Sequence, residues 1–111
     1  MDIYDTHAHL QDPIYESDRN EIIKRAKSLL SGVIVPSYDR MSSLNALSLF
    51  AKDDFLKVTV GIHPHYADTC KDLTFVEEMG SVSNGIGEIG LDYYRNLSPK
   101  EIQKKVFMNN F

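Results

Sequence analysis

The sequence predicts an α/β fold in which short parallel strands alternate with helices. Four apolar segments rich in β-branched residues begin near positions 3, 33, 57 and 85. Amphipathic helical patterns fill the intervals, and parallel βαβ units require this alternation. Because no low-complexity linker or shift in composition interrupts residues 1–111, we expect one part of a single fold without an internal boundary.

The expected strands are the most apolar stretches of the chain. Residues 33–35 and 57–62 have the pattern of strands that are buried on both faces. Residues 3–6 and 85–89 are expected to form the first and last of the four strands. Both run directly into polar motifs, so the ends of these strands are candidate positions for a functional site.

The first helix is expected over residues 17–30, where apolar side chains recur on one face. Asp18 and Glu21 have the spacing of a helix start. Gly32 stands where a C-terminal cap would follow. The segment is therefore predicted to be an amphipathic helix that covers the first strands.

Three further helices are expected. Helical patterns cover residues 42–52 and, more briefly, residues 72–79. The last helix is predicted to begin with Ser98 as its N-cap, Pro99 at the first helical position and Glu101 completing a capping box. Its apolar positions follow at helical spacing.

Four βα units make about half of a (β/α)8 barrel, which needs about 250 residues. Half a barrel leaves two sheet edges and a layer of inward-pointing side chains uncovered. We therefore expect a partner half or a second copy to cover them, or a chain truncated at Phe111 in the middle of a helical turn. The alternative is a small open parallel α/β sheet, which could close at this length.

The composition restricts the function. A net charge of −4 argues against a protein that coats nucleic acid by bulk charge, although a metal-dependent nuclease stays open. The single cysteine, Cys70, cannot form an intrachain disulfide and is expected to be a small, at least partly buried apolar residue in a cytoplasmic protein. The N-terminus lacks the pattern of a signal peptide, and no apolar run reaches the ~20 residues of a membrane span.

The first chemical motif is Asp-Thr-His-Ala-His at residues 5–9. On a strand, residues two apart point to the same face, so His7 and His9 would present two imidazoles to one divalent metal. Asp5 shares that face and could orient an imidazole. The pair could also be surface residues, so the motif alone leaves both interpretations open.

The second motif is Gly-Ile-His-Pro-His at residues 61–65, again at the end of an expected strand. Pro64 stops the strand and stiffens the turn. His63 is the better candidate for the site, as a substrate contact more than as a ligand. His65 is expected to be a solvated turn residue.

The third motif, residues 85–95, contains G-x-G-x-x-G, but a dinucleotide site needs these glycines between a strand and a helix. The alternative places Glu88 at the fourth strand end, where its carboxylate could bind or bridge metals or pair with Arg95 or Lys100. Arg95 suits a phosphate contact or a surface ion pair. Asp92 would support the site from behind its ligands.

These motifs together resemble those of the TatD-type metal-dependent deoxyribonucleases. The resemblance rests on Asp-Thr-His-Ala-His-Leu at residues 5–10, Gly-Ile-His-Pro-His at 61–65 and Gly-Glu-Ile-Gly-Leu-Asp-Tyr-Tyr at 87–94. It covers essentially the whole chain. It implies a TIM-barrel-type (β/α)8 fold, of which this chain supplies about the first four units.

The resemblance also implies a site. His7 and His9 match the first ligand pair of the family, and Glu88 matches its fourth-strand carboxylate. Two divalent ions (zinc, magnesium or manganese) would activate a water that hydrolyses phosphodiester bonds in DNA or a related substrate. The remaining ligands and the general base lie on later strands, for which this sequence has no residues, so activity of the chain alone is doubtful.

Two other functions stay open from the sequence. One is a related enzyme that cleaves small esters, lactones or cyclic amides, although many of these use a modified lysine where this chain has Glu88. The other is a non-catalytic fragment that requires a partner half.

Overall fold

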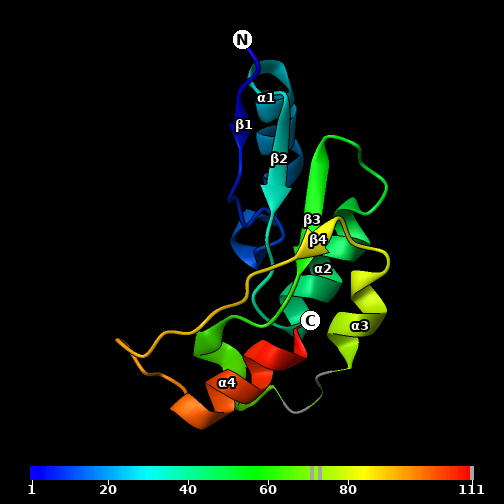
Figure 1. Ribbon diagram of the computed structural model, residues 1–111. Helices are drawn as coiled ribbons and strands as arrows, with labels where there is room; N and C mark the ends of the chain where they lie inside the picture. Colours follow the sequence, from blue (N-terminus) through cyan, green and yellow to red (C-terminus); the bar gives the residue numbers. More distant parts are fainter. Residues whose placement is uncertain (71, 73, 111) are drawn as a thin grey trace.

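A computed structural model describes residues 1–70, 72 and 74–110. Its sheet has four parallel strands in the order β1-β2-β3-β4, so neighbours in sequence are neighbours in space. This confirms the predicted parallel α/β architecture (Figure 1). The strands are β1 (Tyr4–Asp5), β2 (Gly32–Val35), β3 (Leu56–Val60) and β4 (Gly85–Ile86).

The helices surround this sheet unevenly. In Figure 1, α4 lies beyond the carboxyl ends of the strands, where it packs against η2, and α3 lies beside β4. The expected helix over residues 72–79 begins at Phe75, and its residue 73 lies outside the described residues. The helices are η1 (Pro13–Tyr15), α1 (Arg19–Leu29), α2 (Arg40–Phe50), η2 (Pro64–Thr69), α3 (Phe75–Gly80) and α4 (Lys100–Asn109).

The start of α2 explains why this helix begins two residues earlier than predicted. The Asp39 carboxylate accepts a hydrogen bond from the Ser42 backbone N–H at 2.8 Å. The Ser42 hydroxyl accepts one in return from the Asp39 N–H at 3.0 Å. This reciprocal capping box satisfies backbone donors that the first helical turn leaves free. Ser42 is therefore the third residue of the helix, not its first.

Gly32 was expected to cap α1, and that prediction is wrong. The C-cap is Leu30 in an extended conformation, and Gly32 is the first residue of β2. A β carbon at position 32 would lie 3.1 Å from the ring of Tyr4 on β1. The glycine therefore allows a close approach of the Tyr4 ring.

The predicted start of α4 is also wrong. Pro99 occupies the N-cap position without a side-chain cap, and α4 begins at Lys100. The Ser98 hydroxyl instead bonds η2: it accepts from the Asp68 N–H at 3.0 Å and donates to the His65 carbonyl at 3.2 Å. Ser98 is 1% exposed, so a residue that looked like a helix cap is a buried link between two segments.

Two apolar clusters form the core. The first joins β2 and β3 to α2 and the half-buried face of α1. The second lies beneath η2, α3 and α4, so it supports the segments beyond the strand ends. Cys70 packs against this second cluster and is partly buried, as expected. The buried members are Leu10, Val33, Val35, Ala46, Phe50, Leu56, Val58 and Val60 in the first cluster and Ile62, Ala67, Phe75, Val76 and Val106 in the second.

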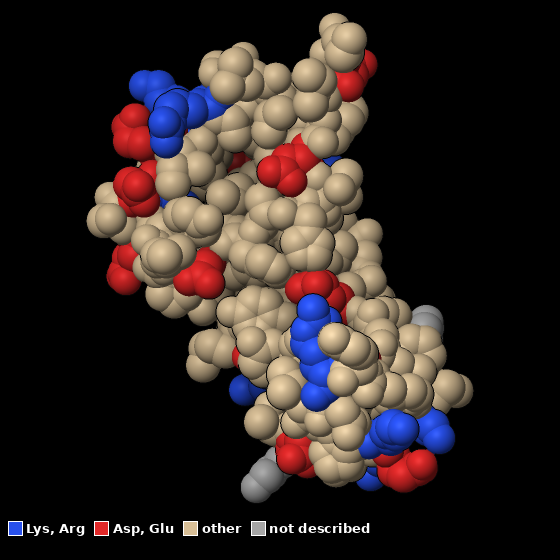
Figure 2. Space-filling view, turned by 90° about the vertical axis from the view of Figure 1, so that its left-hand side faces the viewer, with Lys and Arg blue, Asp and Glu red and all other residues tan. Residues whose placement is uncertain are grey.

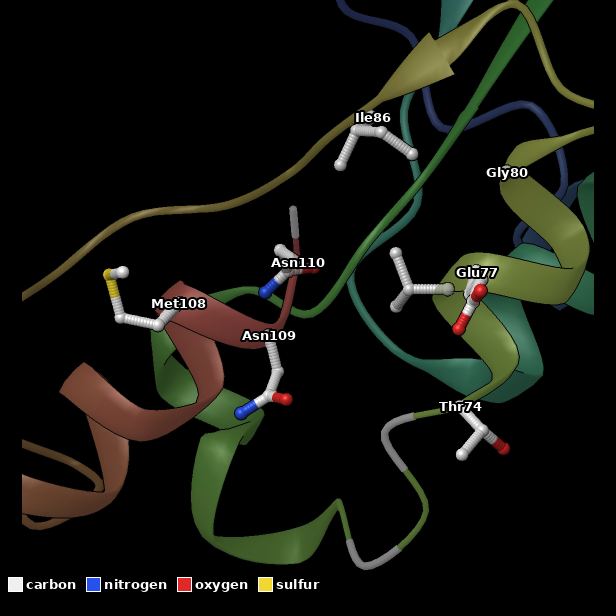
Figure 3. Close-up of a pocket in the computed structure, with 8 residues that line it drawn as sticks. Thr74, Glu77, Gly80, Ile86, Met108, Asn109 and Asn110 are labelled. Carbon is white, nitrogen blue, oxygen red and sulfur yellow. The ribbon is translucent and has the colours of Figure 1, made fainter.

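The sheet is open at both edges. Within the described residues, β1 pairs only with β2 and β4 pairs only with β3. Tyr4 and Ile86 are exposed at these edges. Beside β4, a hollow of about 670 Å³ lies between α3 and the end of α4, with Ile86, Gly80 and Met108 on its walls (Figure 3). The described residues therefore form an open sheet with one side of β4 uncovered.

No described helix combines the length and apolar character that a membrane-spanning segment needs.

Candidate metal centre

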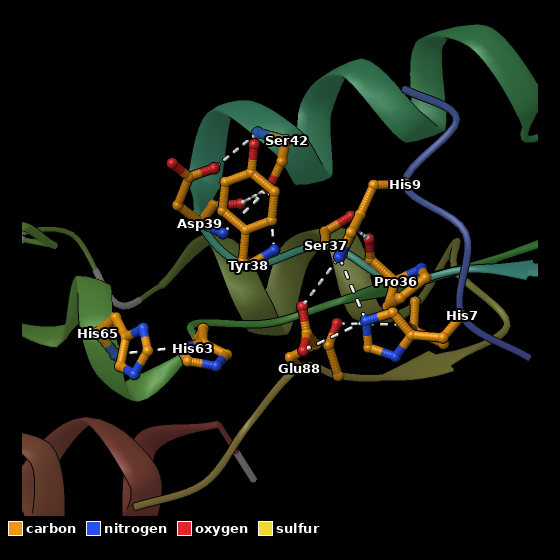
Figure 4. A network of polar contacts seen from close by, with 12 residues as sticks. His7, His9, Pro36, Ser37, Tyr38, Asp39, Ser42, His63, His65 and Glu88 are labelled. Carbon is orange, nitrogen blue, oxygen red and sulfur yellow. Dashed lines mark hydrogen bonds and ion pairs between the residues drawn. The ribbon is translucent and has the colours of Figure 1, made fainter. Parts of the chain in front are cut away.

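Three side chains from opposite edges of the sheet meet at its carboxyl end. His7 and His9 follow β1, and Glu88 follows β4 (Figure 4). The His7 and His9 Nε2 atoms are 3.2 Å apart. Each lies 3.6 Å from one oxygen of the Glu88 carboxylate. The candidate ligand atoms of all three residues lie within 4.8 Å of one another.

The histidines were expected on the first strand, but β1 ends at Asp5. His7 and His9 lie in the segment that follows, where the Ala8 N–H still donates to the Ile34 carbonyl at 3.1 Å. This bond ties the segment to the end of β2, one residue out of the register of the β1–β2 pairs. Both imidazoles reach Glu88 from this segment.

His9 is held in one tautomer. Its Nδ1 lies 2.9 Å from the Pro36 carbonyl oxygen, which can only accept a hydrogen bond. In the neutral ring the proton is therefore on Nδ1, and Nε2 carries the free lone pair. Nε2 is the atom that faces His7 and Glu88. A carbonyl that fixes the ring of a ligating histidine in this way is common behind metal sites.

The distances fit a shared cation. Two nitrogens bound to one tetrahedral ion at about 2.0–2.1 Å would stand about 3.4 Å apart. The His7 and His9 Nε2 atoms are 3.2 Å apart, and each is 3.6 Å from Glu88. Without a proton or a cation between them, two such lone pairs would repel each other. Two imidazoles and a carboxylate therefore form a chemically suitable donor set for a divalent metal.

The backbone holds Glu88 in place. Its N–H donates to the carbonyl of the buried Ser37, after β2. The Thr59 hydroxyl donates to the Gly87 carbonyl at 3.1 Å. Gly61 leaves room for the segment, because a β carbon there would lie 2.7 Å from the Glu88 carbonyl oxygen. Ser37 after β2 and Thr59 on β3 thus hold the backbone that carries the carboxylate.

The alternative partners of Glu88 are engaged elsewhere. Arg95 pairs with Asp92 at 3.1 Å, and the ammonium of Lys100 lies over the ring of Tyr93. The recorded ion-pair partners of Glu88 are His7 and His9.

His63 stands beside this cluster, in a hollow that His9 and Glu88 also line. Its Nδ1 accepts a hydrogen bond from the His65 backbone N–H at 3.0 Å, so the neutral ring carries its proton on Nε2. Burial, reinforced by the neighbouring His65, lowers the pKa of His63. His63 is therefore a neutral hydrogen-bond donor at the edge of the site.

His65 was expected to be a solvated turn residue, and that prediction is wrong. Its side chain is 26% exposed, and Nε2 lies 2.6 Å from the Asp92 carboxylate. Arg95 contacts the same carboxylate, which matches the surface ion pair that the sequence left open. The hydrogen bond from His65 lowers the pKa of Asp92 most, and the hydrogen bonds from Arg95 lower it further. The pKa of Asp92 therefore lies far below its usual range. Asp92 therefore ties the loop after β4 to η2.

Asp5 contacts the backbone, not a ring. Its Oδ1 accepts a hydrogen bond from the His7 N–H at 3.0 Å, which shapes the turn that carries His7. The described side-chain contact of Asp5 is with the backbone of His7, and a role behind the candidate ligands stays a prediction.

The sequence interpretation missed two groups near the cluster. Tyr38 and Tyr66 line the same hollow as His9 and Glu88. Gln11 is 2% exposed and donates to the Pro36 carbonyl at 2.8 Å, behind His9. Tyr38 lies just after β2, so the strand-end rule that selected the histidines could have found it.

The face in Figure 2 carries no single basic region. Its lysine and arginine side chains lie among acidic ones. This pattern agrees with the net charge of −4.

Comparisons with known proteins agree with this geometry. A family model described as TatD related DNase matches residues 4–111. An uncharacterized metal-dependent hydrolase, YabD of Bacillus subtilis, is 38% identical over 96% of this chain and 44% of its own length. A 3'-5' ssDNA/RNA exonuclease TatD of Pectobacterium atrosepticum is 32% identical over 95% of this chain and 43% of its own.

Solved structures show the same fold. A TatD-family hydrolase of Entamoeba histolytica superimposes with a TM-score of 0.81 at 25% identity, over 99% of this chain and 44% of that one. YJJV, a TatD homolog of Escherichia coli, superimposes with a TM-score of 0.79 at 23% identity, over 97% and 44%. The chain thus spans less than half the length of the relatives it matches.

Proposed function

The chain belongs to the TatD-related DNase family, and from this we propose that it provides the metal-binding half of a divalent-metal-dependent phosphodiesterase that acts on nucleic acid. The observation that carries the proposal is the convergence of His7, His9 and Glu88, with ligand atoms within 4.8 Å of one another. The names of relatives that act on single-stranded DNA and RNA support the substrate class. The lone thiol of Cys70 is in keeping with a cytoplasmic location.

The donor set favours zinc. Imidazole nitrogens suit zinc, whereas magnesium and manganese prefer sites made of oxygen ligands. The described residues bring together ligands for one ion at this point, and a second ion would need ligands from further polypeptide. A bound divalent ion would supply Lewis acidity toward a phosphoryl oxygen and lower the pKa of a bound water.

The protein groups around this centre have distinct roles in the proposal. The Nε2–H of His63 is placed to donate to a phosphate oxygen beside Glu88, because both residues line one hollow. Arg95 keeps part of its guanidinium fork free while Asp92 holds one end, so it can contact a neighbouring phosphate. Asp92 and Asp5 position backbone segments and touch no reacting atom.

A zinc titration by calorimetry tests the ligand assignment directly. We expect the His7→Ala and Glu88→Gln variants to bind zinc at least tenfold more weakly than the wild type. Glu78→Gln is the matched control, because Glu78 is an exposed carboxylate on α3, remote from the cluster. Unchanged zinc affinity in both ligand variants would sink the assignment.

The uncovered side of β4 supports a second element of the proposal: a complementary half of the same barrel binds there. Ile86 is exposed at the β4 edge, and the hollow beside it continues to Met108 near the end of α4 (Figure 3). The chain covers 44% of the length of YabD, and the remainder of that relative gives the size that such a half would have. A parallel strand added at β4 would continue the order of the sheet.

This element can be tested by sedimentation and complementation. We expect the chain alone to form no active species on single-stranded DNA, and zinc-dependent nuclease activity to appear when the unmatched remainder of YabD is added. A stable dimer of this chain with activity of its own would show that a second copy, not a complementary half, covers β4.

A further inference from the structure

Two tyrosines stand side by side next to the metal centre. Tyr38 follows the end of β2, and Tyr66 lies in η2. Their ring centroids are 5.1 Å apart with an interplanar angle of 30°. Neither tyrosine is a candidate metal ligand, but the ring of each contacts the ring of a histidine.

The pair is tied to the site at both ends. The ring of Tyr38 meets the ring of His9 edge-on, with centroids 5.5 Å apart. The ring of Tyr66 meets that of His63 in the same manner at 6.2 Å. The four rings therefore form one row, in the order His9, Tyr38, Tyr66 and His63.

This row borders an open hollow of about 380 Å³. The hollow is lined by both tyrosines together with His9, His63 and Glu88. A ligand that touched Tyr66 in this hollow would also lie beside the candidate metal ligands.

Tyr66 is less buried than a core aromatic residue. It is 39% exposed, whereas Tyr38 behind it is half-buried. The outer ring lies against the inner ring and borders the hollow.

We propose that Tyr66, backed by Tyr38, is a stacking surface for one nucleobase of a single-stranded nucleic acid whose phosphate lies at the metal centre. This inference rests on the proposed function, because the metal centre defines where the phosphate lies. Every base has an aromatic face, so stacking gives affinity without sequence preference. The row favours a single strand, since neighbouring base pairs cover both faces of a base inside a duplex.

The two exposed tyrosines on the loop after β4 do not offer the same surface. Tyr94 is 94% exposed on the loop after β4, and the ring of Tyr93 is covered by the Lys100 ammonium. They line none of the described hollows that reach Glu88. Tyr94 therefore provides a matched control for removal of an exposed tyrosine.

Binding of labelled oligonucleotides in zinc at low salt tests the proposal. Fluorescence anisotropy would compare a single strand that carries bases with an abasic strand of equal length. We expect Tyr66→Ala to weaken binding of the base-carrying strand about tenfold and to leave the abasic strand unaffected. Tyr66→Phe should retain the wild-type affinity, because it keeps the ring, and Tyr94→Ala should do the same.

Other outcomes separate the two proposals. Equal binding of the two strands by the wild type, or binding of neither, overturns the stacking surface. An equal loss on both strands in Tyr66→Ala also overturns it, because a structural defect would then explain the change. If zinc binds and depends on Glu88 while Tyr66→Ala changes nothing, only the stacking surface fails. If zinc does not bind, the proposed function fails first.

Discussion

Gly61 lies against the backbone of Glu88 so closely that a β carbon at position 61 would stand 2.7 Å from the Glu88 carbonyl oxygen. It would also stand 2.9 Å from the carbonyl carbon of Gly87. Both neighbours are backbone atoms, so no flexible side chain can move aside. The glycine after β3 thus determines where the candidate ligand after β4 can lie.

Gly61→Ala is therefore expected to displace Glu88. Insertion of a methyl group into a close contact costs about 1–3 kcal/mol of stability. We also expect zinc affinity to fall, because the carboxylate moves away from His7 and His9. Gly90→Ala is the control, since a β carbon at position 90 meets nothing within 4 Å. Zinc calorimetry and urea unfolding measure both effects, and wild-type zinc affinity in Gly61→Ala would refute the spacing argument.

The buried Ser98 hydroxyl gives a second prediction. Ser98→Ala leaves the Asp68 N–H without its acceptor and the His65 carbonyl without its donor. Loss of such buried partners costs about 1–3 kcal/mol. Ser81→Ala removes an exposed hydroxyl that bonds within its own turn, and we expect a change of at most about 0.5 kcal/mol. Equal midpoints of urea unfolding for the two variants would mean that Ser98 does not link η2 to the loop.

The contact between His65 and Asp92 predicts a pH dependence. The pKa of Asp92 is lowered in the folded chain, so the carboxylate stabilises the fold while it is ionised. This contribution is fully present above the ordinary carboxyl pKa of about 3.9 and is lost as pH falls through the lowered folded value. The stability difference between wild type and Asp92→Asn should therefore be constant from about pH 5 to 7 and shrink in stronger acid.

Asp54→Asn serves as the control for this pH series, because Asp54 is exposed on a turn. Its stability difference should stay small at every pH. A difference for Asp92→Asn that persists undiminished in strong acid would assign its effect to packing and not to charge.

Local patterns were sufficient to predict the parallel strands, because apolar runs define strands. A polar residue at the end of such a run lies at the carboxyl edge of a parallel sheet, which made His7, His9 and Glu88 candidates. The resemblance to one family singled out the three together, and the structure brings them together. Their role as metal ligands stays a prediction.

Two of the errors arose where a residue is used by a distant segment. Ser98 has the sequence pattern of a helix cap, but its partners lie in η2, about thirty positions earlier in the chain. His65 was assigned to solvent because its partner, Asp92, is 27 residues away. Such pairings depend on how η2 and the loop after β4 pack over the second core cluster. No local pattern contains that information.

Zinc should stabilise the fold through the same three residues that bind it. A ligand that binds only the folded state adds about 2.7 kcal/mol at a concentration one hundred times its dissociation constant. We therefore expect zinc to raise the thermal midpoint of the wild type by several degrees and a chelator to reverse the shift. Glu88→Gln should lose most of it, because the neutral amide no longer balances the charge of the cation. Glu78→Gln should keep the whole shift. The Glu88 carboxylate joins the segment after β4 to the histidines after β1. An equal shift in Glu88→Gln would therefore mean that zinc binds elsewhere.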